Sequence, residues 1–160
     1  MTIADQITAY LETRLALIRE GNSITLPSGF EWLFACDAGA SVFVNLEYQE
    51  RPEEMPALVL YVGKGNSSQF GGVIDPEIGM EAFTRPISIE GFISCDKRGS
   101  EGWQLLSDIA AAVKSDQTCG GLIDLVDGWE TDMAIQDDEN VFAVVSVKFN
   151  AIYQVPIGTE

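Results

Sequence analysis

The last part of the chain shows the longest regular alternation of apolar and polar positions. Every second residue from 141 to 153 is apolar: Val141, Ala143, Val145, Val147, Phe149, Ala151 and Tyr153. The positions between them begin apolar and turn polar at Ser146, Lys148 and Asn150. A period of two predicts a β-strand. Its length favours a central strand of an antiparallel sheet that is covered on one face and partly wet on the other.

Shorter segments predict further strands. Residues 41–48 and 86–94 alternate, and residues 57–62 form a continuous apolar run that is typical of a strand buried on both faces. Residues 128–135 are expected to pair with the last strand through a turn at residues 137–140. We also expect a hairpin between residues 41–48 and 57–62, and a short edge strand around residues 30–34.

Two helices are predicted. Apolar residues at helical spacing run from residue 3 to 18, Thr2 and Asp5 resemble a capping box, and Gly21 is a natural stop, so the first helix is expected over residues 3–20. The second is expected from an N-cap at Ser100 to Lys114 in its last turn. A short turn is expected at residues 122–126. The fold class is α+β, a two-layer sandwich of a mainly antiparallel β-sheet with two principal helices on one face, in a single domain over residues 1–160.

Residues 63–84 have no convincing period and are rich in glycine. We interpret them as a long loop, and loops of this length in a compact domain usually serve a function. Apolar side chains in a loop suggest a contact with a partner. The candidates for a partner-binding loop are Lys64, Phe70, Met80 and Phe83.

The cysteine and tryptophan residues are predicted to serve packing and not catalysis. Cys36, Cys95 and Cys119 are odd in number and widely spaced, which fits reduced, buried thiols in a cytosolic protein. Trp103 is expected in the core. Trp129 belongs either to the core, which we favour, or to an interface.

Charge and composition restrict the function. The chain has 25 acidic and 9 basic residues, a formal net charge of -16, and no histidine. A negative field of this size disfavours nucleic-acid binding through a broad basic surface. The absence of histidine removes the usual triads and most transition-metal sites. The segment after residue 62 fails the spacing of phosphate-binding loops. We therefore expect no catalytic residues, no metal and no cofactor.

No segment resembles a signal peptide or approaches the roughly 20 apolar residues that a membrane helix needs. The expected location is a cytoplasm, or a particle assembled there, with no membrane partner.

The whole-chain pattern resembles the tail terminator, or tail completion, proteins of long-tailed bacteriophages and prophages. The resemblance covers residues 2–153 and is carried by the opening helix IADQITAYLETRLALI, the strand RPISIEGFIS leading into GWQLLSDIAAAV, and the closing pair DGWETDMAI and ENVFAVVSVKFNAIYQ. It implies a structural protein of the virion tail, assembled in the host cytoplasm. Such proteins form six-membered rings that cap the tail tube, stop its polymerisation and present a surface to the head–tail connector, while DNA passes through the hole without specific binding.

In such a ring the negative charge would face the DNA, since attraction to phosphate would slow its passage. Two acidic groups are candidates for the lumen. The first is Glu130, Asp132, Asp137, Asp138 and Glu139, and the second is Glu47, Glu50, Glu53 and Glu54. A solvated turn is the simpler interpretation of the first group, and a cation site the weaker one.

Two other functions stay open. An acidic soluble binding or adaptor module for a basic protein partner predicts a stable monomer whose binding weakens with salt. A small enzyme that uses carboxylates predicts a concave pocket with at least two buried acids.

Overall fold

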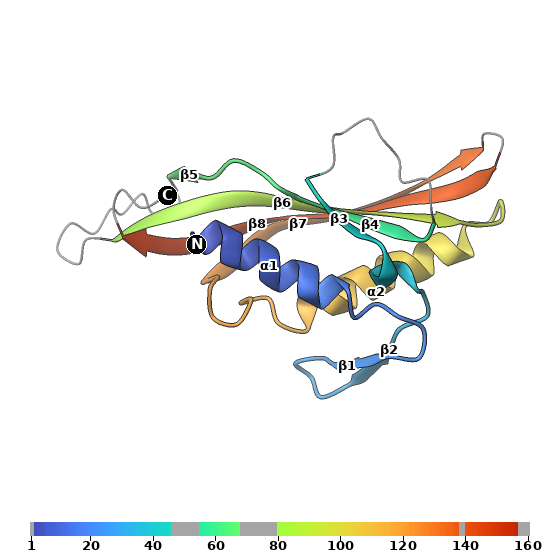
Figure 1. Cartoon of the computed structure of the whole chain (residues 1–160), viewed down its shortest axis with the longest axis horizontal. Helices are drawn as coiled ribbons and strands as arrows, with labels where there is room; N and C mark the ends of the chain where they lie inside the picture. Colours follow the sequence, from blue (N-terminus) through green and yellow to red (C-terminus); the bar gives the residue numbers. More distant parts are fainter. Residues whose placement is uncertain (1, 46–54, 68–79, 138–139, 157–160) are drawn as a thin grey trace.

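A six-stranded sheet with both helices on one face organises the protein (Figure 1). The computed structural model describes residues 2–45, 55–67, 80–137 and 140–156. The elements in chain order are α1 (Ile3–Leu15), β1 (Ser23–Thr25), β2 (Glu31–Leu33), the 3₁₀ turn η1 (Ala38–Ala40), β3 (Val42–Val44), β4 (Ala57–Val62), β5 (Asn66–Ser67), β6 (Met80–Ser94), α2 (Ser100–Lys114), β7 (Leu125–Asp137) and β8 (Val141–Pro156). The expected α+β class, a two-layer sandwich, is confirmed.

The sheet has the order β3-β4-β6-β8-β7, and β5 pairs with the outer part of β6. All these pairs are antiparallel except β3 with β4. The predicted last strand, β8, is confirmed in its central place between β6 and β7. Its register joins Val147 to Ile89 on one side and to Thr131 on the other.

The core lies between the helices and the covered face of the sheet. Fully buried side chains come from α1 (Ile7, Leu11, Leu15), from α2 (Leu105, Ile109, Ala112) and from the strands (Leu58, Leu60, Ile87, Ile89, Val145, Val147). Burying each of the larger ones stabilises the fold by about 1.5–3 kcal/mol. The two helices are thus held mainly by apolar packing.

Helix α2 approaches the sheet closely because glycine stands at two contact points. A Cβ atom on Gly91 of β6 would lie 2.7 Å from Leu105 Cδ2, and one on Gly102 of α2 would lie 2.7 Å from the Cβ of Ala143. Neither gap has room for a methyl group, so these glycines set the distance between the layers.

A two-stranded arm, β1 with β2, stands apart from the main sheet (Figure 1). It is fastened to α2 by Asp108, whose carboxylate is 1% exposed. The carboxylate accepts hydrogen bonds from Trp32 Nε1 (2.9 Å) and from the backbone N–H groups of Ala35 (3.1 Å) and Cys36 (3.0 Å). An isolated hairpin is barely stable in water, so this anchor holds the arm in place.

Helix α1 begins as predicted but ends earlier. The capping box is present, with Thr2 Oγ1 accepting from Asp5 N–H at 3.0 Å and Thr2 N–H donating to Asp5 Oδ2 at 3.0 Å. The predicted end at residue 20 is wrong, since the helix ends at Leu15. Ile18 continues the apolar spacing because it is buried in the turn that follows. Its carbonyl accepts from the N–H of Gly39, which ties this turn to η1.

The predicted hairpin between residues 41–48 and 57–62 is wrong, because β3 and β4 are parallel. Alternation marks a strand but carries no information about the direction of its neighbour. Residues 45–56 supply the dozen residues that a parallel crossover needs. The predicted burial of residues 57–62 on both faces is confirmed for the first four of them.

The predicted loop over residues 63–84 is partly wrong. Residues 66–67 form β5, and β6 begins at Met80 instead of at Pro86. Proline inside a strand argues against a central position. Here the carbonyl of Pro86 accepts from Gly63 N–H at 2.8 Å, just beyond the end of β4. The missing N–H of Pro86 therefore falls where no strand needs it.

Three smaller predictions also change. The N-cap of α2 is Gly99 instead of Ser100, which is the first helical residue. The turn expected at residues 122–126 already contains the start of β7 at Leu125. The prediction that Trp103 lies in the core is wrong, because its side chain is 55% exposed on the side of α2 away from Leu105 and Ile109. Trp129 is half-buried, stacks on Phe149 at 5.5 Å and lies below Lys114 Nζ at 4.5 Å.

Candidate functional site

The helix-free face of the sheet gathers polar and charged side chains at its centre. Two cross-strand rows carry them. One row is Tyr61, Ser88, Lys148 and Glu130, and the other is Val59, Glu90, Ser146 and Asp132. Residues opposite one another on neighbouring strands have Cβ atoms about 4.5–5.5 Å apart. The face therefore presents one compact group of charges built from four strands.

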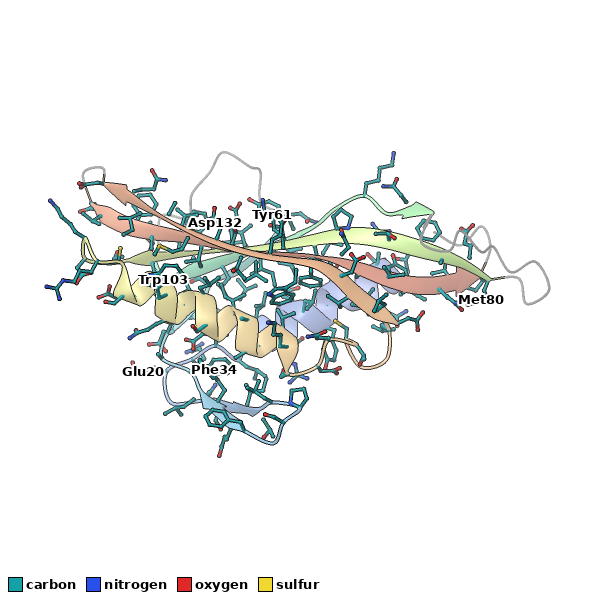
Figure 2. The ribbon with its side chains drawn as sticks, turned by 180° about the vertical axis from the view of Figure 1, so that it is seen from behind. Glu20, Phe34, Tyr61, Met80, Trp103 and Asp132 are labelled. Carbon is teal, nitrogen blue, oxygen red and sulfur yellow. The ribbon has the colours of Figure 1, made fainter. Side chains whose placement is uncertain are left out.

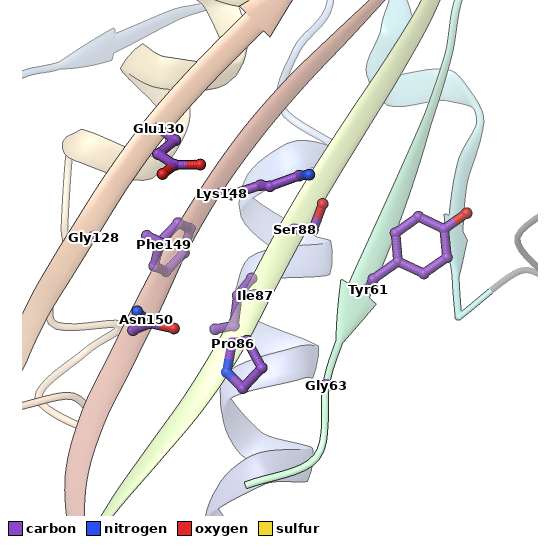
Figure 3. Close-up of a pocket in the computed structure, with 10 residues that line it drawn as sticks. All are labelled: Tyr61, Gly63, Pro86, Ile87, Ser88, Gly128, Glu130, Lys148, Phe149 and Asn150. Carbon is purple, nitrogen blue, oxygen red and sulfur yellow. The ribbon is translucent and has the colours of Figure 1, made fainter. Parts of the chain in front are cut away.

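A shallow depression of about 380 Å³ lies within this face. Figure 3 shows Lys148 extending from β8 toward Ser88 on β6, with Glu130 on one side and Tyr61 on the other. Phe149 and Pro86 contribute apolar atoms to its lining. The depression is open and mixes apolar and polar atoms, so its shape suits a surface contact better than the enclosure of a small molecule.

A β-bulge gives the depression its outer edge. The register of β7 on β8 shifts between Asp127 and Glu130, and Gly128 has a positive φ of 64°. A Cβ on Gly128 would lie 2.8 Å from Asn150 Nδ2. The positive φ thus favours glycine here, a side chain at this position would also have to displace the Asn150 amide, and the bulge brings Glu130 into line with Lys148.

The balance of charge on this face is negative. Glu130 and Asp132 are exposed, and Glu90 is half-buried, against Lys148 as the one exposed cation that the described residues place on this face. The cross-strand pair of Glu130 and Lys148 contributes about 0.2–1 kcal/mol at most in such a wet position. The pair itself adds little to stability, and the excess of carboxylates on this face offers a negative surface to whatever lies opposite.

The same face has an apolar end. Val59, Phe92 and Phe142 form a small buried cluster there, with Met55 and Val144 packed beside them. The helix-free face is thus divided into an apolar, buried end and a charged centre.

The predicted acidic candidates for a lumen divide among three places. Glu130 and Asp132 lie together on the helix-free face. Asp137 is exposed at the end of β7 and pairs with Val141, so it belongs to the opposite side of the strand. The remaining members of the two acidic groups lie outside the described residues: Asp138, Glu139, Glu47, Glu50, Glu53 and Glu54.

The candidates for a partner-binding loop that the structure describes differ in their exposure to solvent. Lys64 is exposed between β4 and β5, and Met80 is half-buried at the start of β6. Phe70 lies outside the described residues. The interpretation of Phe83 as an exposed residue is wrong: it is 8% exposed, and its ring stacks on that of Tyr153 at 6.4 Å. It belongs to the core because β6 starts earlier than predicted and Phe83 points to the helices.

Sequence reasoning missed Glu90 and Lys148 as members of the charged centre. Both stand at polar positions of predicted strands. Aligning the polar parity of residues 86–94 with that of residues 141–153 would have placed them on one face.

A second polar cluster ties α1 to the segment after α2. Tyr10 donates to Asp116 Oδ2 at 2.6 Å and accepts from Arg14. Hydrogen bonds from the side chains of Thr118 and Tyr10 lower the pKa of Asp116 to about 2. Burial, followed by the hydrogen bond to Asp116, raises the pKa of Tyr10. Each group already takes part in hydrogen bonds within the cluster, so the cluster has a structural role: it joins α1 to the segment after α2.

The thiols are inert by position. Cys36 and Cys119 are buried, and burial raises the pKa of each to about 12. Cys95 is half-buried, and burial raises its pKa as well. The predicted burial is confirmed for Cys36 and Cys119, and none of the three cysteines forms a disulfide.

Within the described ranges, no group of three or more Cys, Asp or Glu side chains is arranged to hold a metal ion. Across the same ranges, none of the helices has the length and apolarity needed to cross a membrane.

Comparison with known proteins gives no relative: no protein-family model matches the chain, and no curated protein matches it.

Proposed function

We propose that this chain is a structural phage protein that caps the tail tube as a ring, ends tail polymerisation and provides the head-joining surface. The observation that carries the proposal is the division of the sheet into one face packed by helices and one face that none of the described helices covers, with charge at its centre. The resemblance of the whole chain to tail terminators supplies the identity of the assembly.

In this proposal the helix-free face lines the hole of a six-membered ring. Glu90, Glu130 and Asp132 then recur in each copy around the lumen. Like charge repels the phosphates of DNA and keeps its passage free of sticking. Lys148, flanked by Glu130, is held within the negative surface and does not offer an isolated cation.

The role needs no catalytic residue. The one buried charged side chain in the described part of the chain is Asp108, and three N–H donors occupy its carboxylate. A group so fully engaged serves structure, which agrees with a protein that works by contact.

The test is tail assembly with and without this chain. Tails built without it are expected to vary in length or to overgrow, and adding the purified protein should restore one length and the joining of heads. Negative-stain images give both readouts. Tails of normal length that join heads without the chain would contradict the proposal.

The acidic adaptor predicted as the alternative function gives a different outcome in the same system. It would leave tail length unchanged, and the chain would remain a monomer that binds a basic protein in a salt-sensitive manner.

A further inference from the structure

The β1–β2 arm, here residues 22–35, carries two large apolar side chains into solvent. Phe30 is 62% exposed and Leu33 is 65% exposed, while Ile24 and Phe34 of the same arm are buried toward the helices. Figure 1 shows the arm projecting from the helix layer on the side away from the sheet. The arm thus fixes its inner side firmly and leaves an apolar outer side bare, which a solvated hairpin does not require.

The arm is also poor in charge. Glu31 is the only charged residue between positions 21 and 36, although 21% of the chain is charged and about three charges would be expected there. In a chain with a net charge of -16, copies repel one another over most of their surface. A charge-poor apolar projection is therefore a place where two copies can approach.

A matching hollow lies on the outer side of α1. It is a groove of about 550 Å³, lined by Gln6, Ala9, Tyr10, Thr13, Leu17 and Leu122, with Arg14 as the only charged residue in its lining. Leu17 is 39% exposed at one end. The groove thus offers the apolar side chains of Leu17 and Leu122 beside the positive charge of Arg14, which also donates a hydrogen bond to Tyr10. The arm offers Phe30 and Leu33 beside the negative charge of Glu31, which also accepts a hydrogen bond from Ser23 Oγ at 2.6 Å.

We propose that the arm of one copy docks into the α1 groove of the next copy, with Phe30 and Leu33 in the hollow and Glu31 facing Arg14. Apolar area, the low charge of both surfaces and the opposite sign of their single charges all favour this partner. The contact joins two different surfaces, so it is heterologous and generates a ring when the rotation closes. This inference rests on the proposed ring and names the contact that builds it.

The apolar part is tested by the double variant Phe30→Ser and Leu33→Ser. Both side chains are exposed, so the fold should be kept, as circular dichroism will check. Sedimentation velocity of the full chain, up to about 1 mM, is expected to show self-association of the wild type and a loss of at least about thirtyfold in the variant. The matched control is Trp103→Ser, which removes an equally exposed aromatic from another surface and should leave association unchanged.

The charged part is tested by exchanging signs. Arg14→Glu alone and Glu31→Arg alone each place like charges in the contact and should weaken association about tenfold. In an equimolar mixture the two variants alternate, every arm meets a groove of opposite sign, and association returns. This recovery needs folded chains, so it separates the contact from any instability caused by losing the bond from Arg14 to Tyr10.

Three results would overturn the docking proposal: a wild type that stays monomeric over the whole range, a double variant that associates like the wild type, or a mixture that does no better than its components. None of these depends on tail length. Conversely, normal tails made without the chain would remove the terminator role and leave the docking result standing.

Discussion

The two sides of strand β8 show how one segment serves two purposes. Val145, Val147 and Phe149 are buried under the helices, while Lys148 between them is exposed on the helix-free face. The covered side holds most of the apolar contacts that stabilise the fold, whereas Ser146 and Lys148 at the centre of the helix-free side add little to the core. These central polar positions are therefore available for contact with another molecule.

Figure 2 shows the same division from behind, with Trp103, Phe34 and Glu20 on the helix side of the sheet and Tyr61 and Asp132 toward the other. The helix side is not uniform, because the β1–β2 arm is attached to it through the buried Asp108 carboxylate and the buried side chains of Ile24 and Phe34. The molecule thus separates a rigid core, an acidic surface and a fastened arm.

The largest difference between the helix-covered and the helix-free face is expected when neighbouring residues of β6 are truncated. Ile89→Ala removes a fully buried side chain below the helices and should lower the free energy of unfolding by about 4 kcal/mol. Ser88→Ala on the bare face should change it by less than about 0.5 kcal/mol. Urea denaturation measures both. Equal losses would show that the bare face also carries the fold.

The next largest effect on the free energy of unfolding is expected from substitutions at Asp108, which anchors the β1–β2 arm. Asp108→Ala leaves three N–H donors without their acceptor and should cost about 3 kcal/mol. Asp108→Asn keeps one oxygen for the backbone of Ala35 and Cys36, so its cost should be smaller. Hydrogen exchange is expected to speed up at these two amides while the amides of β8 remain protected in the alanine variant. Uniform deprotection of arm and sheet would contradict a local anchor.

The smallest effect depends on pH and concerns the fastening of α1. The pKa of Asp116 is about 2 in the folded protein against an ordinary 3.8, so its carboxylate stabilises the fold above about pH 4. This contribution is lost as the pH falls from about 4 to about 2. The difference in unfolding free energy between the wild type and Asp116→Asn should therefore shrink over that range. A difference that is constant from neutral to acid pH would count against the carboxylate.

Much of the architecture follows from periodicity. The alternation of residues 141–153 predicts a central strand with a covered face, and the spacing from Ile3 to Ile18 predicts a helix with a capping box; both are found, although the helix ends at Leu15. These patterns are local, so they can be read one segment at a time. The direction of β3 against β4 and the exposure of Trp103 depend on neighbours, and no local pattern contains that information.

The candidate site was only half predictable for the same reason. Glu130 and Asp132 are conspicuous as a run of acids, but Glu90 and Lys148 join them only through the register of three strands. The charge-poor arm was visible in the sequence as a stretch with Glu31 alone. Its significance appears only once Phe30 and Leu33 are seen to face outward.

The most direct test of the proposal that the helix-free face lines a DNA channel is the rate of DNA release from particles that carry Glu130→Lys and Asp132→Lys. These changes lie in exposed positions of β7 and should leave tail length and folding intact. Attraction to phosphate should slow release about tenfold, whereas the control pair Glu12→Lys and Glu20→Lys on the helix side should release DNA at the wild-type rate. Normal release from the first variant, or equal slowing in the control, would contradict a lumen lined by this face.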